Sequence, residues 1–433
     1  MTSARLLAVR CLAAQEKGGY SNLIFKQQAG GAGLSERDTA FAAALFYGAL
    51  ERRATLDYIL SPLLSRPIAR LDAEVRCALR MGLYQCLYMD GVPVRAAVDE
   101  SVALCGALGK TSAKGLVNAV LRRASEFDLS SLDALGTSVT GVAVRCSVCE
   151  PLAALLLSQY GGQTERMLEA TFERRPAAAR VNTLRTDTTA LIAALAAENV
   201  PAQKTWLTDA VELGAGWLSS AAFLRGDLRV QSVAAQCAAA AVDPQPGERV
   251  LDMCAAPGGK TLTMAQRMQN RGRIVALDIH DSRLKLIDDA ARKEGVSIAE
   301  TRCADAADYA DDAAFDRVLC DVPCSGYGEL AAKPELRYKE PAQENTLVPL
   351  QRAILENGAR KLRRGGRLVY ATCTLDRREN EDVASAFLGE NADFRAIDPP
   401  LPARAPRDAQ GFVTFLPGVD DNEGFFIATF ERI

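Results

Sequence analysis

The sequence predicts a multi-domain protein: an all-α bundle at the N-terminus, a small α+β domain in the middle and a C-terminal α/β domain. The chain has 433 residues, enough for about three domains at roughly 150 residues each. Apolar residues recur at helical spacing as far as about Phe127, whereas short β-rich runs alternate with helical stretches from Gln231 onward. Hydrophobic residues make up 48% and charged residues 24%, which is ordinary for globular proteins and argues against a disordered or fibrous chain.

The N-terminal prediction rests on periodicity and a helix start. Ser35 and Asp38 resemble a capping box in front of an apolar run. Apolar residues further along follow helical spacing, namely Leu71, Val75, Ala78, Leu79, Leu83, Cys86 and Leu87. A turn-rich stretch over residues 128–142 then suggests a boundary. We therefore divide the chain into residues 1–130, 131–230 and 231–433.

The middle domain shows a helical pattern over residues 152–172, a strand over 180–182 and a helix over 188–198. In the C-terminal domain we expect strands over residues 249–253, 273–278, 297–303, 317–321 and 367–373, with residues 424–430 closing the sheet. Five of these strands end at or near a reactive side chain, namely Asp252, Asp278, Asp305, Asp321 and Cys373. Open α/β sheets bind ligands at the carboxyl ends of their strands, so these residues predict a ligand site.

Composition and charge narrow the range of functions. His280 is the only histidine, which argues against Ser-His-Asp hydrolases and histidine-rich zinc sites. The net charge is −3, but residues 1–125 contain 16 Lys and Arg against 10 Asp and Glu, a balance of +6. This uneven charge predicts that the N-terminal bundle binds a polyanion such as RNA.

Other features concern the cellular compartment and metals. No apolar run approaches the ~20 residues that span a bilayer, and the N-terminus lacks the pattern of a signal peptide. Twelve cysteines are scattered rather than arranged as a disulfide framework. We expect a cytoplasmic protein, monomeric and without membrane contact. Cys146 and Cys149 lack a second pair or a histidine, so we expect no metal.

A loop of small residues follows the first C-terminal strand, where backbone can approach a nucleotide-like ligand closely. It does not match a phosphate-binding P-loop, because Cys254 occupies the position of the first glycine, and the dinucleotide fingerprint is also absent. An adenosine ligand without pyrophosphate, such as S-adenosylmethionine, fits better. Asp278 would hold the ribose and Asp305 the adenine, unless each aspartate merely caps a helix. The amino-acid end would lie on Cys254, Ala255, Ala256, Pro257, Gly258, Gly259 and Lys260.

Cys324 and Cys373 both follow strands that should open on this site. Methylation of cytosine at C5 requires prior addition of a nucleophile to C6, and a thiolate suits that task. Asp321 is available to hold the N3 edge of the base, and a second thiol could help to eliminate the adduct. The remaining cysteines outside the Cys146/Cys149 pair and the loop are expected to be small packing residues, namely Cys11, Cys77, Cys86, Cys105, Cys237, Cys303 and Cys320.

Nearly the whole chain resembles the bacterial small-subunit ribosomal RNA cytosine-C5 methyltransferases of the Sun/RsmB type. Residues 79–85, 92–98 and 115–122 resemble the NusB-like RNA-binding module of that family, and residues 180–185 match the segment that joins it to the catalytic domain. The stretches that match in the catalytic domain are Leu251-Asp252, Cys254-Ala255-Ala256-Pro257-Gly258-Gly259-Lys260-Thr261, Asp321-Val322-Pro323-Cys324-Ser325-Gly326, Ala371-Thr372-Cys373-Thr374 and Glu379-Asn380-Glu381.

The resemblance implies a Rossmann-like class I methyltransferase domain that uses S-adenosylmethionine. It makes Cys373 the nucleophile and Cys324 the residue that assists release, whereas DNA enzymes use the cysteine that matches Cys324. Asp321 would lie between cofactor and base, and Lys260, Asp278 and Asp305 would belong to the cofactor site.

The substrate implied by the resemblance is 16S ribosomal RNA, unassembled or partly assembled, because a target cytosine must leave its stack. Two alternatives remain: a non-catalytic RNA-binding or antitermination factor with a vestigial methyltransferase fold, and a cytosine-C5 methyltransferase that acts on another RNA. The chain departs from the family at Ala331-Ala332-Lys333-Pro334, where paired arginines are common. In this stretch, where the resemblance implies RNA contacts, Lys333, Arg337 and Tyr338 are retained.

Overall fold

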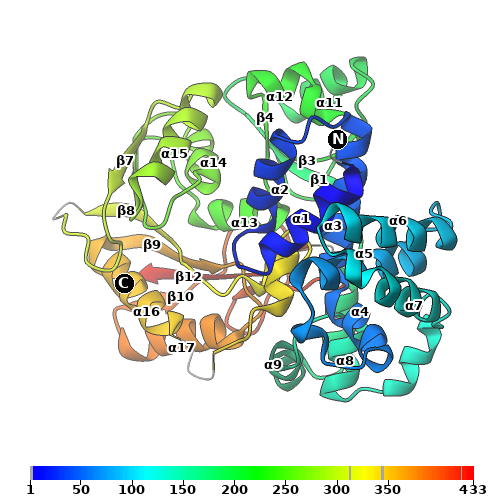
Figure 1. Cartoon of the computed structure of the whole chain (residues 1–433). Coiled ribbons are helices and arrows are strands. Elements are labelled where there is room, and N and C mark those ends of the chain that lie inside the picture. The colour runs from blue at the N-terminus through cyan, green and yellow to red at the C-terminus, as the bar shows by residue number, and fades with distance from the viewer. Residues whose placement is uncertain (1–2, 312–313, 343–345, 421) are drawn as a thin grey trace. The chain divides into compact units, whose positions relative to one another are not determined.

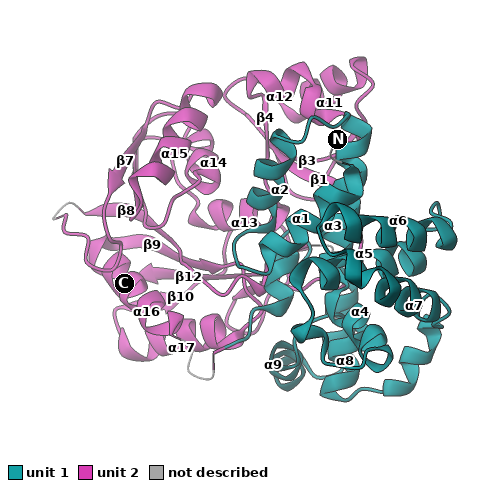
Figure 2. Cartoon of the chain, viewed as in Figure 1, with its two compact units in different colours: residues 1–172, 329–341 teal, residues 173–328, 342–433 magenta. Residues whose placement is uncertain are grey.

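The computed structural model describes residues 3–311, 314–342, 346–420 and 422–433, and Figure 1 shows its helices and strands along the chain. They form two compact units, coloured separately in Figure 2. Unit 1 comprises Met1–Phe172 and Glu329–Pro341, and unit 2 comprises Glu173–Gly328 and Ala342–Ile433.

Unit 1 is helical, as predicted. The predicted start at Ser35 is confirmed, because its Oγ accepts a hydrogen bond from the Asp38 amide at 3.1 Å. Val75, Ala78, Leu79 and Leu83 are buried in the core, so the periodicity correctly identified the inner face of that helix. The α-helices are α1 (Ala4–Gln15), α2 (Ser21–Gly30), α3 (Glu36–Glu51), α4 (Arg53–Leu60), α5 (Ala73–Tyr88), α6 (Val94–Ala107), α7 (Lys114–Ala124), α8 (Val139–Arg145), α9 (Glu150–Tyr160) and α10 (Gln163–Ala170).

In the described part of the chain, no single helix has the length and apolar character needed to cross a membrane, although the bent pair α8 and α9 passes that test when taken together.

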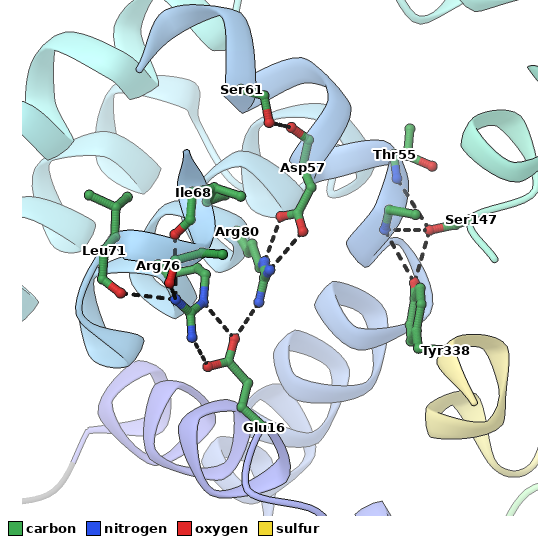
Figure 3. A network of polar contacts seen from close by, with 12 residues as sticks. Glu16, Thr55, Asp57, Ser61, Ile68, Leu71, Arg76, Arg80, Ser147 and Tyr338 are labelled. Carbon is green, nitrogen blue, oxygen red and sulfur yellow. Dashed lines mark hydrogen bonds and ion pairs between the residues drawn. The ribbon is translucent and has the colours of Figure 1, made fainter. Parts of the chain in front are cut away.

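Part of the basic charge of unit 1 stabilises its own fold. Arg80 forms a two-pronged ion pair with Asp57, with Nε and Nη2 donating to the carboxylate at 2.6 and 2.7 Å. Glu16 on the chain after α1 accepts from both Arg76 and Arg80 (Figure 3). Burial alone would lower the pKa of Arg80, but its hydrogen bonds to Asp57 and the negative charges around it together outweigh burial and raise it. The two arginines are therefore matched by two carboxylates inside the bundle.

The segment Glu329–Pro341 packs within unit 1, which contradicts the expected RNA contacts at two residues. The Arg337 side chain is fully buried; it donates to the Cys146 carbonyl at 3.1 Å and to the Thr171 hydroxyl. Burial lowers its pKa to about 10. The Tyr338 hydroxyl lies 3.0 Å from Ser147 Oγ (Figure 3). Arg337 and Tyr338 are thus structural residues, since the two Nη atoms of Arg337 and the hydroxyl of Tyr338 are hydrogen-bonded inside the bundle.

Unit 2 contains a small antiparallel sheet in the order β2-β3-β1-β4. The predicted strand and helix of this region are observed as β1 (Ala177–Val181) and α11 (Thr188–Ala197). Three more strands and a short helix were not predicted, namely β2 (Ala202–Lys204), β3 (Ala210–Leu213), β4 (Leu228–Val230) and α12 (Ala221–Arg225).

The large sheet of unit 2 has the order β10-β12-β9-β8-β5-β6-β7, with β11 paired to β12. All six predicted strands are present, but the last one does not close the sheet, because β10 lies beyond it and pairs with it. The strands are β5 (Arg249–Asp252), β6 (Arg273–Asp278), β7 (Ala299–Cys303), β8 (Phe315–Asp321), β9 (Leu362–Thr372), β10 (Phe394–Ala396), β11 (Val413–Phe415) and β12 (Phe425–Arg432).

Helices cover both faces of this sheet, as expected for a Rossmann-like fold. One core includes apolar residues of α13 (Val233–Val242) and α14 (Gly259–Arg267). The core on the other face includes apolar residues of α16 (Leu347–Lys361) and α17 (Glu381–Glu390). The helix α15 (Asp281–Glu294) follows β6.

Candidate active site at the carboxyl ends of the parallel strands

The strand register brings the predicted reactive residues to one edge of the sheet. The strands from β7 through β6, β5 and β8 to β9 are parallel to their neighbours, so their carboxyl ends meet. Asp278 is level with Cys303, and Asp321 is level with Ala371, two residues before Cys373. The expectation that these residues share one edge is met.

The small-residue loop after β5 is tied down before it enters α14. The amide of Ala255 donates to the Leu277 carbonyl at 2.7 Å. Two arginines hold the next two carbonyls: Arg283 donates to that of Ala256 at 2.8 Å, and Arg229 donates to that of Pro257 at 3.2 Å. The backbone of the loop is thereby fixed on three successive residues.

Gly258 is required for this loop. Its φ is +94°, and a Cβ at this position would lie 3.2 Å from the Ile287 side chain, tighter than most real contacts. Only glycine combines that backbone conformation with that approach.

Asp252, at the end of β5, is almost fully buried. Its Oδ2 accepts from the Thr261 hydroxyl at 2.7 Å, whereas Oδ1 has no partner among the described residues. Burial, and then the nearby Asp321 charge, raise the pKa of Asp252 to about 7. The unpartnered oxygen leaves an acceptor available beside the loop.

The predicted cofactor residues Asp278 and Asp305 differ in setting. Asp278 is buried, accepts from the His280 amide at 2.9 Å and pairs with Arg283 at 3.2 Å. Asp305 is exposed and accepts from the Ala307 amide at 2.9 Å. Neither carboxylate caps the first turn of an α-helix, so the helix-capping alternative does not describe them.

Lys260 and Asp321 form an ion pair with Nζ and Oδ2 2.6 Å apart. Burial would lower the pKa of Lys260, but Asp321 and, more weakly, Cys373 outweigh it, so the pKa is raised. The Lys260 amine is therefore held protonated beside the Asp321 carboxylate.

The two cysteines singled out in the sequence lie against each other. Their Sγ atoms are 3.3 Å apart, and both side chains are partly buried. The amide of Gly328 donates to the Cys373 carbonyl at 3.0 Å, and a Cβ on Gly328 would collide with the backbone of Gly424. The chain after Cys324 is therefore held closely against the turn that carries Cys373.

The other cysteines bear out the packing interpretation, with one exception. Cys11, Cys77, Cys105, Cys237 and Cys320 are buried and Cys86 is partly buried. Cys303 is exposed at the carboxyl end of β7, so its prediction as a packing residue is wrong. It is the last residue of β7, which is an edge strand of the sheet.

Sequence reasoning noticed Glu379 and Asn380 without giving them a role, and it missed Gln351, Arg229 and Arg283. Gln351 is fully buried and donates to the Pro323 carbonyl and to Glu379 Oε2. The signal that could have found it is a polar residue on the inner face of an amphipathic helix. Arg229 and Arg283 give no local signal, because each acts on a carbonyl distant in sequence.

Comparisons with known proteins agree with this arrangement. Residues 239–431 match the family model "16S rRNA methyltransferase RsmB/F", residues 2–126 match the NusB family, and residues 152–216 match the ferredoxin-like domain of RsmF/B-like methyltransferases. A protein of Bacillus subtilis named "Probable ribosomal RNA small subunit methyltransferase B" is 34% identical over 100% of this chain and 99% of its own length. A protein of Synechocystis with the same name is 33% identical over 100% of both chains.

Among solved structures, a methyltransferase homologue protein from Pyrococcus horikoshii has a TM-score of 0.60 and 27% identity, covering 71% of this chain and 100% of its own. Full-length similarity to the bacterial proteins and agreement of the domain models lead to one conclusion: the chain belongs to the RsmB/F family of 16S ribosomal RNA methyltransferases with an N-terminal NusB domain.

Proposed function

We propose that the chain forms 5-methylcytosine in 16S ribosomal RNA through a covalent bond between Cys373 and C6 of the target cytosine. The observation that carries the proposal is the pair of thiols 3.3 Å apart, next to the ion pair of Lys260 and Asp321 at the strand edge. A structural role alone does not account for two adjoining thiols beside a paired lysine and aspartate.

S-adenosylmethionine is the methyl donor of this methyltransferase family, and it supplies an electrophilic methyl group. The residues present fit such a molecule: the carbonyls of the small-residue loop are fixed by Arg229 and Arg283, and Asp252 Oδ1 is an acceptor without a described partner. Asp278 would accept from the ribose hydroxyls and Asp305 from the adenine amino group. The amino-acid end would lie on the Cys254–Lys260 loop.

In our proposal the two cysteines act in different steps of the reaction. The Cys373 thiolate adds to C6, which places electron density on C5, and Asp321 holds the N3 edge of the base. After C5 is methylated, a base takes the C5 proton, the electrons of that C–H bond form the C5–C6 double bond, and the bond from Cys373 to C6 breaks with its electron pair returning to sulfur. Cys324 assists this last step.

The substrate proposal concerns RNA whose target cytosine can leave its stack, hence 16S ribosomal RNA before assembly is complete. The N-terminal surplus of basic residues supports RNA binding by that part of the chain. We propose a cytoplasmic monomer. The non-catalytic alternative is disfavoured because the two thiols and their charged neighbours are all in place.

The test compares Cys373→Ala with Cys324→Ala. The first variant should lose both methyl transfer and any covalent complex. The second should still attack and methylate but fail to release, leaving a denaturant-resistant protein–RNA adduct. Denaturing gel electrophoresis after incubation with S-adenosylmethionine and 16S RNA should therefore show a shifted band for Cys324→Ala only.

An adduct with Cys373→Ala but not with Cys324→Ala would reverse the two roles, as in the DNA enzymes. Full activity in both variants would refute the covalent mechanism. Bisulfite sequencing of ribosomal RNA from cells with and without the gene identifies the modified position. Protection of cytosines in another RNA only would favour the alternative substrate.

A further inference from the structure

We propose that the adjacent residues Glu379 and Asn380 position the two cysteines separately: Glu379, with Gln351, holds the Cys324 loop, and Asn380 holds the Cys373 turn. This inference rests on the proposed function, from which it takes the roles of the cysteines. It assigns a task to the Glu379-Asn380-Glu381 motif, which the chemistry described above does not use.

The Cys324 loop is held on both sides of the cysteine. Glu379 Oε2 accepts from the Ser325 amide at 3.0 Å, immediately after Cys324. Gln351 Nε2 donates to the Pro323 carbonyl at 3.0 Å, immediately before it, and to the same Glu379 oxygen at 2.7 Å. The peptide groups that flank Cys324 are thus fixed by two side chains that are themselves bonded to each other.

The Cys373 turn is held in the same manner by the next residue. Asn380 Oδ1 accepts from the Thr372 hydroxyl, and Asn380 Nδ2 donates to the Thr374 carbonyl at 3.0 Å. These two partners flank Cys373. One side chain therefore fixes both neighbours of the proposed nucleophile.

Further hydrogen bonds fix the backbone at Glu379 and join the two cysteine segments. The Tyr370 hydroxyl, from β9, donates to the Glu379 carbonyl at 2.6 Å. Ser325 Oγ and Thr374 Oγ1, one from each cysteine segment, are 2.5 Å apart. The spacing of the two thiols is therefore set by the direct contact between Ser325 and Thr374 together with the hydrogen bonds to residues 379 and 380.

Burial shows that these contacts are not incidental surface bonds. Glu379, Asn380 and Gln351 are each 0% exposed. Glu379 Oε1 and Gln351 Oε1 have no hydrogen-bond partner within the described residues. Burying a carboxylate with one oxygen unpaired costs stability, so packing alone would favour an apolar residue here. Positioning the Cys324 loop explains why a carboxylate is used.

Separate positioning predicts opposite kinetic defects in the two variants. A displacement of about 1 Å in a reacting group can reduce a rate by roughly 100-fold. Asn380→Ala should slow adduct formation, and with it single-turnover methyl transfer, by roughly tenfold or more without accumulation of adduct. Glu379→Ala should leave single-turnover methyl transfer within a few-fold of wild type while the denaturant-resistant adduct accumulates, as in Cys324→Ala.

The experiment uses the full chain with S-adenosylmethionine carrying a tritiated methyl group and 16S RNA, and it follows methyl transfer and adduct in the same samples. Glu379→Gln keeps an acceptor oxygen toward Ser325 and should restore most of the release rate. Gln351→Leu removes the same support from the other side and should also accumulate adduct. This variant provides the test if Glu379→Ala does not fold.

Glu381→Gln is the matched control. Glu381 is the next acid in the motif and is partly buried, but its Oε1 faces the Thr414 hydroxyl at 3.4 Å rather than either cysteine segment. This variant should match wild type in both measurements. Thermal unfolding of every variant separates a general loss of stability from a specific defect.

Two kinds of result would overturn the inference. If wild type and the cysteine variants behave as proposed but the Glu379 and Asn380 variants lose transfer and release in parallel, only the separate positioning is wrong. If wild type forms no 5-methylcytosine, or Cys373→Ala still methylates, the proposed function fails and the inference fails with it.

Discussion

Ionisation of one buried residue, Asp252 at the strand edge, lowers the stability of the folded protein. An aspartate in an unfolded chain has a pKa of ~3.9, whereas burial and the Asp321 charge raise the folded-state pKa of Asp252 to about 7. Between these two values the folded protein binds more protons than the unfolded one. The free energy of unfolding therefore falls as the pH rises from about 4 to about 7, and the loss remains above that range.

We predict that Asp252→Asn removes this pH dependence. The amide keeps an oxygen for the Thr261 hydroxyl but cannot ionise. Urea unfolding from pH 4 to pH 8 should show the variant gaining stability over wild type as the pH rises, by at most roughly 4 kcal/mol for a shift of about three pKa units. Parallel curves for the two proteins would mean that Asp252 ionises normally in the folded state.

Among the residues of the site, those that directly follow a strand could be predicted from the sequence better than those that hold them in place by hydrogen bonds. Cys324, Cys373 and Asp321 could be identified because a strand end places a side chain at a defined edge. The pattern of α16 could have marked Gln351 as a buried polar residue but not its role, since its two partners each lie 28 residues away in sequence and only the packing of α16 brings them together. The exposure of Cys303 was missed because the composition of its segment does not show where the strand stops.

At the scale of elements, a buried ion pair joins the small sheet to the helices of the large sheet. Arg180 of β1 and Glu294 of α15 are 2.6 Å apart and each is 3% exposed. Arg229 of β4, which also holds the Pro257 carbonyl, pairs with the same carboxylate at 3.1 Å. Gln266 of α14 donates to it at 3.2 Å. The position of the small-residue loop after β5 is thus linked to the small sheet.

Removal of one partner from this pair should be strongly destabilising. Glu294→Ala leaves the Arg180 guanidinium buried without its carboxylate, so the free energy of unfolding should fall by roughly 3–5 kcal/mol. The double variant Arg180→Met with Glu294→Met removes both charges and should lose less than the single variant. Denaturant unfolding of the two proteins checks the order, and a larger loss in the double variant would contradict it.

Strands were predictable where a run of apolar residues ended in a polar residue, as in β5, β6 and β8. The strands β2, β4, β10 and β11 have three residues each, too short for alternation to be recognised. The predicted closing strand β12 carries a further strand because the pairing of Phe394–Ala396 is set by tertiary contact rather than by local pattern.

At the scale of the whole molecule, sequence order and spatial units differ. Residues 329–341 lie in sequence between the two parts of unit 2 but pack within unit 1. The reason is specific: Arg337 and Tyr338 find their hydrogen-bond partners there, at Cys146, Thr171 and Ser147. The division into residues 1–130, 131–230 and 231–433 stays a prediction about independently folding parts.

The basic surplus of the N-terminal part bears on RNA binding. The internal network of Arg76 and Arg80 with Glu16 and Asp57 is neutral overall, so it leaves the balance of +6 over residues 1–125 unchanged. Exposed basic side chains carry that surplus, including Lys114, Arg122 and Arg123 on α7. Such residues are free to approach phosphates without loss of a described ion pair.

We predict that changing Lys114, Arg122 and Arg123 together to Glu weakens RNA binding and reduces its dependence on salt. Each phosphate contact with single-stranded RNA contributes ~0.7 to the slope of log affinity against log salt, so loss of three contacts should lower the slope by about 2. Filter binding of 16S RNA fragments over a range of salt concentrations measures both quantities. The same charge change at the exposed residues Lys204, Lys285 and Arg292 of unit 2 is the control. If the control lowers affinity and slope equally, net charge alone drives binding, whereas a loss confined to the α7 variant, with S-adenosylmethionine affinity unchanged, assigns RNA binding to unit 1.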